Sequence, residues 1–66
     1  MQAQYDSEVD VLRIIWSDAP IEESDEDQPG IILDYDLDGQ VIGVEILNAS
    51  QRIANIDRIT PTVKPG

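Results

Sequence analysis

Residues 34–45 read DYDLDGQVIGVE, which fits the pattern D-x-[DN]-x-[DN]-G-x5-E of a twelve-residue calcium loop. In such a loop Asp34, Asp36 and Asp38 bring oxygen ligands to the ion from alternate positions. Gly39 allows the sharp turn, and Glu45 closes the coordination shell with two oxygens. The spacing is right for this chemistry, so the segments on either side of the loop must decide whether it forms.

Both flanking segments predict strands, whereas an EF-hand needs an amphipathic helix on each side of its loop. The entry QPGIIL contains Pro29-Gly30 and bulky residues, and the exit VIGVEIL alternates like a strand and contains Gly43. Residues 36–39 then suit a type I turn that ends in a left-handed glycine, with carboxylates accepting hydrogen bonds from turn amides. Glu45 would lie several residues beyond the turn, in the strand that leaves it, and this is too far from the turn to close a coordination shell. A calcium-binding module that uses the 34–45 loop therefore stays an alternative.

Other catalytic chemistry finds little support in the composition. The chain has no Cys and no His, so it lacks thiolate nucleophiles, disulfides, the commonest metal ligand and the usual proton shuttle. Asp34 and Asp36 could form a general acid–base couple, and Glu45 could be a catalytic carboxylate. Solvated turn acids, and a strand carboxylate paired with Arg13 or Arg52, are the simpler interpretations. We therefore predict a protein without enzyme activity or cofactor.

The charge balance indicates the kind of partner. Fourteen acidic residues against four basic ones give a formal net charge of −10 at pH 7, which repels nucleic-acid phosphates and anionic lipids and attracts basic surfaces. We expect no direct binding to nucleic acid or membranes. The alternative is that the charge only keeps a small domain soluble. No segment reads as a signal peptide or a membrane span, so we expect a cytoplasmic protein.

Hydrophobic periodicity predicts an α+β fold, in which a four-stranded antiparallel β-meander precedes one C-terminal amphipathic helix. The strands are expected at residues 2–6, 9–16, 31–36 and 40–47. The acidic segment 17–30 is predicted to be an exposed, mobile connection. The second strand carries apolar residues on both of its faces. One face carries Leu12, Ile14 and Trp16, and the other carries Val11, Arg13 and Ile15. In the strand at 31–36 the expected inward residues are Ile31, Leu33 and Tyr35, and in the strand at 40–47 they are Ile42, Val44 and Ile46.

The helix follows from a change of period in NASQRIANIDRI, where Ala49, Ile53 and Ile56 recur at helical spacing. Asn48 is a suitable N-cap, and Pro61 makes helix improbable beyond residue 60. We therefore predict one domain over residues 1–60 and a flexible tail over residues 61–66.

The stretches YDSEVDVLRI and PGIILDYDLDGQVIGVEILNAS together resemble the small bacterial family known as domain-of-unknown-function family 2283 over residues 5–50. The family pattern runs through a tyrosine-aspartate pair, an aspartate-x-leucine strand and DxDxxGxxxGxEIxxAS. Arg13 departs from it, because an aromatic residue is frequent there. The matching positions in the second stretch are Asp34, Asp36, Gly39, Gly43, Glu45, Ile46, Ala49 and Ser50. The resemblance supplies no catalytic residues; it implies an antitoxin-type partner of a small basic protein that resembles ribonuclease toxins.

Charge and resemblance together lead to the hypothesis of a non-enzymatic acidic binding module, an antitoxin-like protein that masks the basic surface of a small cognate partner. Trp16 can be read as an interface anchor or as a residue at the edge of the core. We also expect a homodimer, since one helix covers one face only, and a structural homo-oligomer without a ligand is a further alternative. The predicted partner contacts are Glu22, Glu23, Asp25, Glu26, Asp27, Val11, Arg13, Ile15 and Trp16.

Overall fold

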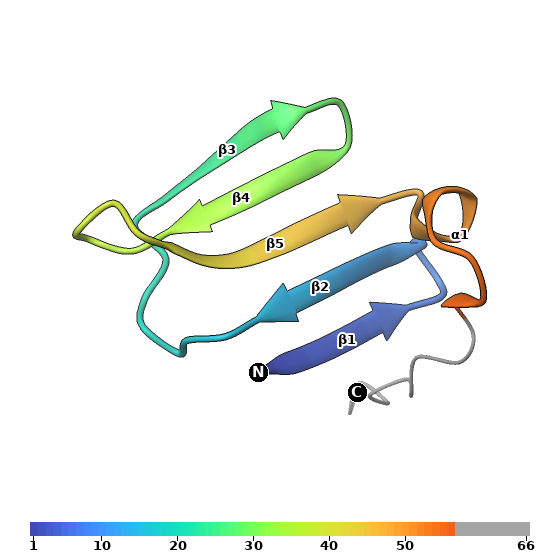
Figure 1. The fold of residues 1–66 in the computed structure, drawn as a ribbon, viewed down its shortest axis with the longest axis horizontal. Coiled ribbons are helices and arrows are strands. Elements are labelled where there is room, and N and C mark those ends of the chain that lie inside the picture. The colour runs from blue at the N-terminus through green and yellow to red at the C-terminus, as the bar shows by residue number, and fades with distance from the viewer. Residues whose placement is uncertain (57–66) are drawn as a thin grey trace.

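The computed structural model describes residues 1–56, which form one antiparallel sheet of five strands and a short helix (Figure 1). The strands are β1 (Gln2–Asp6), β2 (Val11–Ile15), β3 (Glu23–Gln28), β4 (Ile31–Tyr35) and β5 (Val41–Leu47), and the helix is α1 (Ala49–Arg52). The α+β class and the four expected strands are thus confirmed, and β3 is an additional strand. Nothing helical within residues 1–56 has the length and apolar character of a membrane span.

The predicted meander is wrong, because the strands lie in the order β1-β2-β5-β4-β3. The last strand, β5, enters the sheet between β2 and β4, so that Leu12 faces Ile46 and Leu33 faces Val44. A central position suits β5, whose sequence VIGVEIL is mainly apolar and gains packing neighbours on both sides. The chain between β2 and β3 runs past the ends of β5 and β4 and reaches the far edge of the sheet, which makes this order possible (Figure 1).

The acidic segment is also different from the expected loop, because residues 23–28 form the edge strand β3. Every residue of β3 is exposed, and the strand pairs with β4 alone, with a register shift between Glu26 and Gln28. An edge strand needs hydrogen-bonding partners on one side only, and charged side chains are common there because they discourage unwanted pairing. An acidic sequence that would be unfavourable in a central strand is therefore tolerated in the edge strand.

The β4–β5 connection confirms the predicted hairpin turn. The Asp36 Oδ1 atom accepts hydrogen bonds from the amides of Asp38 and Gln40, each at 2.9 Å. The Gly39 amide donates to the Asp36 carbonyl at 3.0 Å, and Gly39 has a φ of 81°, in the left-handed region. The Asp36 carboxylate thus stabilises the backbone of the turn.

The core lies on the face of the sheet that α1 covers. Its buried members are Leu12, Ala49 and Ile56, and Tyr5, Ile14, Ile46 and Ile53 pack around them. The predicted inward direction of Leu12 and of the Ala49, Ile53 and Ile56 set is therefore confirmed. Ile31 faces Ile46 and belongs to the same side.

The length of the helix was predicted wrongly. It ends at Arg52, and Ile53 already has an extended backbone with φ −119° and ψ 121°. Asn48 occupies the N-cap position but has a φ of 53° and makes no side-chain capping bond. Hydrophobic contact holds Ile53 and Ile56 inward without the α-helix that their spacing predicts. The predicted domain end at residue 60 and the tail at 61–66 lie outside the described residues.

Candidate functional site

The face of the sheet opposite α1 carries a row of polar side chains, and we call it the open face. The register places Gln4 opposite Arg13, Arg13 opposite Glu45, Glu45 opposite Ile32 and Ile32 opposite Glu26. The neighbouring row contains Ile15, Gly43, Asp34 and Ser24. Directly opposed residues in an antiparallel sheet project from the same face, so these side chains share one surface. Among residues 1–56 no helix covers it.

Asp34 is the most buried polar residue of this surface. Its exposed fraction is 1%, and Ser24 Oγ donates a hydrogen bond of 2.7 Å to its Oδ1 atom. Gly43 leaves room for it, because a Cβ atom at Gly43 would lie 3.4 Å from Asp34 Oδ2. Interpreting Asp34 as a solvated turn acid was therefore wrong. The reason is that β4 continues through Asp34, whose side chain lies on the open face between Ser24 and Gly43 and next to Ala19 and Ile21 of the segment after β2.

Glu45 lies between Asp34 and Arg13. Burial raises the pKa of Glu45, as do the charge of Asp34 and a side-chain hydrogen bond with it, while the charge of Arg13 acts in the opposite direction. Arg13, one of the two basic residues expected beside Glu45, lies directly opposite it in β2. The Nε atom of Arg13 is buried and has no hydrogen-bond partner in the described part of the chain. The open face thus holds two interacting carboxyl groups and an arginine whose hydrogen bonds are incomplete.

The candidate calcium ligands do not converge. Asp34 and Glu45 lie on the open face, whereas Asp36 and Asp38 belong to the hairpin turn, where Asp36 Oδ1 already accepts two amide hydrogen bonds. Within residues 1–56 no three His, Cys, Asp or Glu side chains gather in a way that could hold a metal ion. The strands on both sides separate the ligand set that the motif lists.

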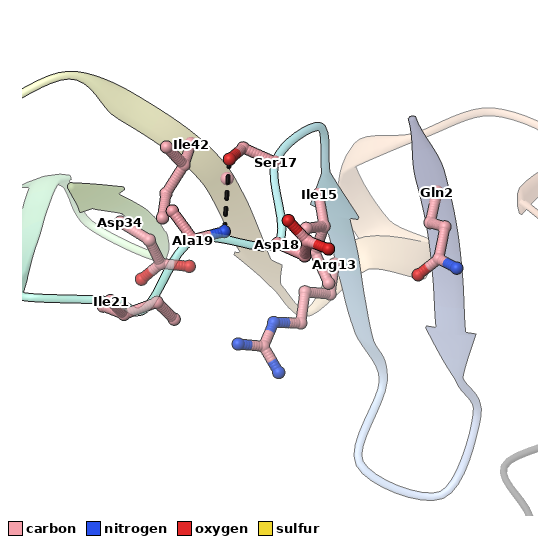
Figure 2. Close-up of a pocket in the computed structure, with 10 residues that line it drawn as sticks. Gln2, Arg13, Ile15, Ser17, Asp18, Ala19, Ile21, Asp34 and Ile42 are labelled. Carbon is pink, nitrogen blue, oxygen red and sulfur yellow. Dashed lines mark hydrogen bonds between the residues drawn. The ribbon is translucent and has the colours of Figure 1, made fainter. Parts of the chain in front are cut away.

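A pocket of about 250 Å³ opens at one end of the open face, where the segment after β2 passes over it (Figure 2). The Ala19 amide donates to Ser17 Oγ at 3.2 Å, which fixes the bend in this segment. We predicted that Ile42 lies on the same side of β5 as Val44 and Ile46. The register changes between Asp34 and Tyr35, and Ile42 lines the pocket instead. The lining consists of Gln2, Arg13, Ile15, Ser17, Asp18, Ala19, Ile21, Asp34, Ile42 and Gly43.

Comparison with known proteins identifies the family. The chain matches the family model described as "Protein of unknown function (DUF2283)" over residues 2–50. The chain belongs to the DUF2283 family. No curated protein and no solved structure gives a significant match. The matched region contains all five strands of the DUF2283 protein and ends within α1.

A hydrogen-bonded cluster that sequence reasoning missed joins the two ends of this DUF2283 region. Tyr5 Oη donates to Asp10 Oδ1 at 2.6 Å, and Ser50 donates to the same carboxylate from its amide at 2.9 Å and its Oγ at 2.7 Å. The Ala49 amide donates to the Asp10 carbonyl at 3.0 Å. Asp10 therefore supplies the cap that Asn48 does not. Only the spacing of the family pattern, which contains the tyrosine and the Ala-Ser pair, hinted at this contact.

The cluster changes the ionisation of its members. The hydrogen bonds from Tyr5 and Ser50 lower the pKa of Asp10 below its usual value. The hydrogen bond to Asp10 raises the pKa of Tyr5, with burial adding to the effect. Ser50 Oγ donates a hydrogen bond to a carboxylate whose pKa is lowered, and a carboxylate of lowered pKa is a weak base for activating a hydroxyl nucleophile. We interpret the cluster as the attachment of α1 to the β1–β2 connection.

The predicted partner contacts fall into two groups. The acidic residues between 22 and 27 lie in β3 or directly before it, while Val11, Arg13 and Ile15 lie on the open face of β2. β4 and β5 separate the two strands, so at ~4.8 Å per strand they lie ~14 Å apart. Trp16 follows β2 directly; its side chain is 46% exposed, and its indole N–H donates to the Val41 carbonyl at 2.7 Å. The structure thus places Trp16 at the end of β2, with its side chain half open to solvent.

Proposed function

We propose that this DUF2283 protein is a non-enzymatic acidic binding module that masks the basic surface of a small protein partner, in the manner of an antitoxin. The observation that supports the proposal is the edge strand β3. Its sequence is ESDEDQ, all six residues are exposed, and within residues 1–56 it pairs with β4 alone. A strand of this kind offers negative charge and unpaired backbone groups on the same edge.

The edge favours a basic partner over a second copy of the chain. An extended segment that pairs with β3 would gain backbone hydrogen bonds, which is a common mode of peptide recognition. A second β3 would bring carboxylates opposite carboxylates, and like charges that face each other across strands are destabilising. Lysine and arginine side chains of a partner would instead meet Glu23, Asp25 and Glu26. The charge pattern therefore selects for a basic segment and against self-pairing.

Apolar anchors for such a complex lie in the segment that connects β2 with β3. Trp16 is 46% exposed and Ile21 is 45% exposed. Long-range attraction between charges acts mainly on the rate of encounter, while desolvated aromatic and aliphatic anchors slow dissociation. We propose this division of labour, with β3 steering the partner and Trp16 helping to retain it.

Two variants of equal net charge test the proposal. In Glu23→Gln/Asp25→Asn the charge is removed from β3, and in Asp6→Asn/Glu8→Gln it is removed from β1 and the β1–β2 connection, at the opposite edge of the sheet. The partner is the product of the neighbouring gene, where that product is small and basic, and association is followed by stopped flow at several salt concentrations. We expect the β3 variant to associate more slowly and with a flatter salt dependence than the control, because screening acts over about 8–10 Å. A β3 variant that gives the same curve as the wild type would mean that the charge serves solubility alone, and identical curves for the two variants would refute the assignment of steering to β3.

A homodimer is a second proposal, supported by the apolar side chains of the open face. Val11, Ile15, Ile32 and Leu47 are only half-buried, and α1 packs on the opposite side. Apolar surface left open on a small domain favours association, and a two-fold interface would bury it on both copies. Light scattering across protein concentrations tests this, and Ile32→Glu is the variant expected to give the monomer mass. A monomer mass for the wild type at millimolar concentration would refute the proposal.

A further inference from the structure

We propose that the pocket at the end of the open face binds a small zwitterion with an apolar body, the chemistry of a free aliphatic amino acid. In this arrangement the ligand carboxylate lies at the Arg13 guanidinium and the ligand ammonium lies at Asp34 and Asp18. The proposal is independent of the basic protein partner. It rests on three properties of the pocket: opposite charges in its lining, an incompletely hydrogen-bonded arginine, and a group of aliphatic side chains.

The opposite charges come from different elements. Figure 2 shows Arg13 of β2 and Asp34 of β4 approaching the pocket from separate strands, with Asp18 contributed by the segment that passes over it. An anion without a positive group would meet the carboxylates of Asp34 and Asp18. A cation without a negative group would meet Arg13. A ligand that carries both charges complements both sides of the pocket.

Two polar groups in the lining have unused hydrogen-bonding capacity. Asp34 is 1% exposed, and a carboxylate has about four acceptor sites. Ser24 Oγ occupies one of them, and the Glu45 side chain takes part in another hydrogen bond. Arg13 has a buried Nε atom without an acceptor among residues 1–56. Buried polar groups in proteins are normally satisfied, so the unpaired Nε shows that the hydrogen bonds of the Arg13 guanidinium are incomplete, and Arg13 is also a lining residue of the pocket.

Apart from Gln2, Ser17 and Gly43, the rest of the lining is apolar, and the volume of the pocket limits the size of the ligand. Ile15, Ile21 and Ile42 line the pocket together with Ala19, and Ile42 is only 5% exposed. The pocket volume of about 250 Å³ is smaller than the ~300–1,000 Å³ typical of sites for drug-sized ligands. A short aliphatic side chain fills such a space, and a nucleotide or an aromatic cofactor does not. The chemistry therefore points to an aliphatic amino acid of about the size of leucine.

Three probes with the same branched apolar body separate the contributions of the two charges. L-Leucine carries both charges, isovalerate carries the carboxylate alone, and isoamylamine carries the ammonium alone. Each is titrated into the full-length 15N-labelled protein, and amide shifts are followed at Ala19 and Gly43. We expect leucine to give saturable shifts at these amides, and each single-charge probe to need at least a tenfold higher concentration for the same response.

Charge-removing variants assign each end of the ligand. Arg13→Gln is expected to weaken leucine binding at least tenfold and to leave isoamylamine unchanged or bound more tightly. Asp34→Asn is expected to weaken leucine and to spare isovalerate, and Asp6→Asn on β1 is the matched control without effect. Should Asp34→Asn fail to fold, as judged from its amide spectrum, the partly buried Arg13 variant still decides. Isoamylamine binding as tightly as leucine would overturn the proposal in favour of a cation pocket, and the absence of shifts with all three probes would overturn it altogether.

Discussion

Gly43 of β5 lies against the backbone of β2, and its replacement by alanine is the sharpest test of the sheet's packing. A Cβ atom at this position would lie 3.1 Å from the Ile14 carbonyl oxygen and 3.4 Å from Asp34 Oδ2. The carbonyl belongs to the backbone of β2 and cannot move without disturbing the β2–β5 ladder. Overpacking of this kind costs about 1–3 kcal/mol, and the loss of glycine's freedom in the unfolded chain returns about 0.4–1 kcal/mol. We therefore expect Gly43→Ala to lower the free energy of unfolding by about 1–2 kcal/mol.

That loss is large for this protein. A chain of 66 residues at about 0.05–0.15 kcal/mol per residue has a total stability of about 3–10 kcal/mol. Urea unfolding, followed by Trp16 fluorescence and far-ultraviolet circular dichroism, should show a lower midpoint with an unchanged slope. Gly39→Asn is the control, because Gly39 has φ +81°, which Asn tolerates, and nothing lies within 4 Å of its added Cβ. Wild-type stability in Gly43→Ala would show that the two strands have room that the structure does not contain.

Three further predictions concern the core, the α1 attachment and the carboxyl pair. Leu12 is 2% exposed in the core, so Leu12→Ala should lower the free energy of unfolding by about 2–5 kcal/mol, measured by urea unfolding at low temperature. Tyr5→Phe removes the 2.6 Å hydrogen bond to Asp10, and we expect faster amide hydrogen exchange at Ser50 than in the wild type, with exchange in β4 unchanged. Burial and Asp34 raise the pKa of Glu45 above its ordinary 4.5, so its contribution to stability is fully present below pH 4.5 and is lost as the pH rises through the raised value. Glu45→Gln should therefore be more stable than the wild type at neutral pH, with the difference shrinking as the pH falls; a difference that stays constant between about pH 4 and 8 would contradict the burial of Glu45.

The elements that the sequence predicted well are those that local interactions determine. The Asp-Gly turn between two apolar runs identified the β4–β5 hairpin, and the alternation in β2 placed Leu12 and Ile14 on the core side. The order of the strands depends on contacts distant in sequence, such as Leu12 with Ile46. Turn chemistry and periodicity carry no information about such pairs. The meander was the simplest order consistent with the hairpins, and it failed at the pairing of β2 with β5.

Composition could not distinguish the β3 edge strand from a loop. Both are exposed and both tolerate carboxylates, because neither requires burial of its side chains. What makes residues 23–28 a strand is the free edge of β4, with Asp25 facing Leu33 and Ser24 facing Asp34. That edge exists only after β5 has taken its place beside β2. The assignment of β3 therefore depends on the topology that the sequence alone did not predict.

The candidate site was hidden for a related reason. The motif DYDLDG groups Asp34 with the acidic residues of the hairpin turn. Its burial to 1% exposure comes instead from its position in β4 and from the space that Gly43 leaves. The cap on Ser50 comes from Asp10, forty residues earlier, whereas capping rules look for a residue next to the helix. Each of these groups gains its role from a neighbour brought in by the sheet.

The open face departs from what stability alone would select. A small domain has little stability to spare, and burying a carboxyl group beside a second one is unfavourable unless hydrogen bonds and opposite charge compensate. Here Ser24 donates a hydrogen bond to the Asp34 carboxylate, and Arg13 lies opposite Glu45 with its Nε unpaired within residues 1–56. Places where a sequence violates local packing rules are often places where it binds something. This is why we direct the ligand search to the open face and the partner search to β3, since the first has unsatisfied buried groups and the second has solvated charge.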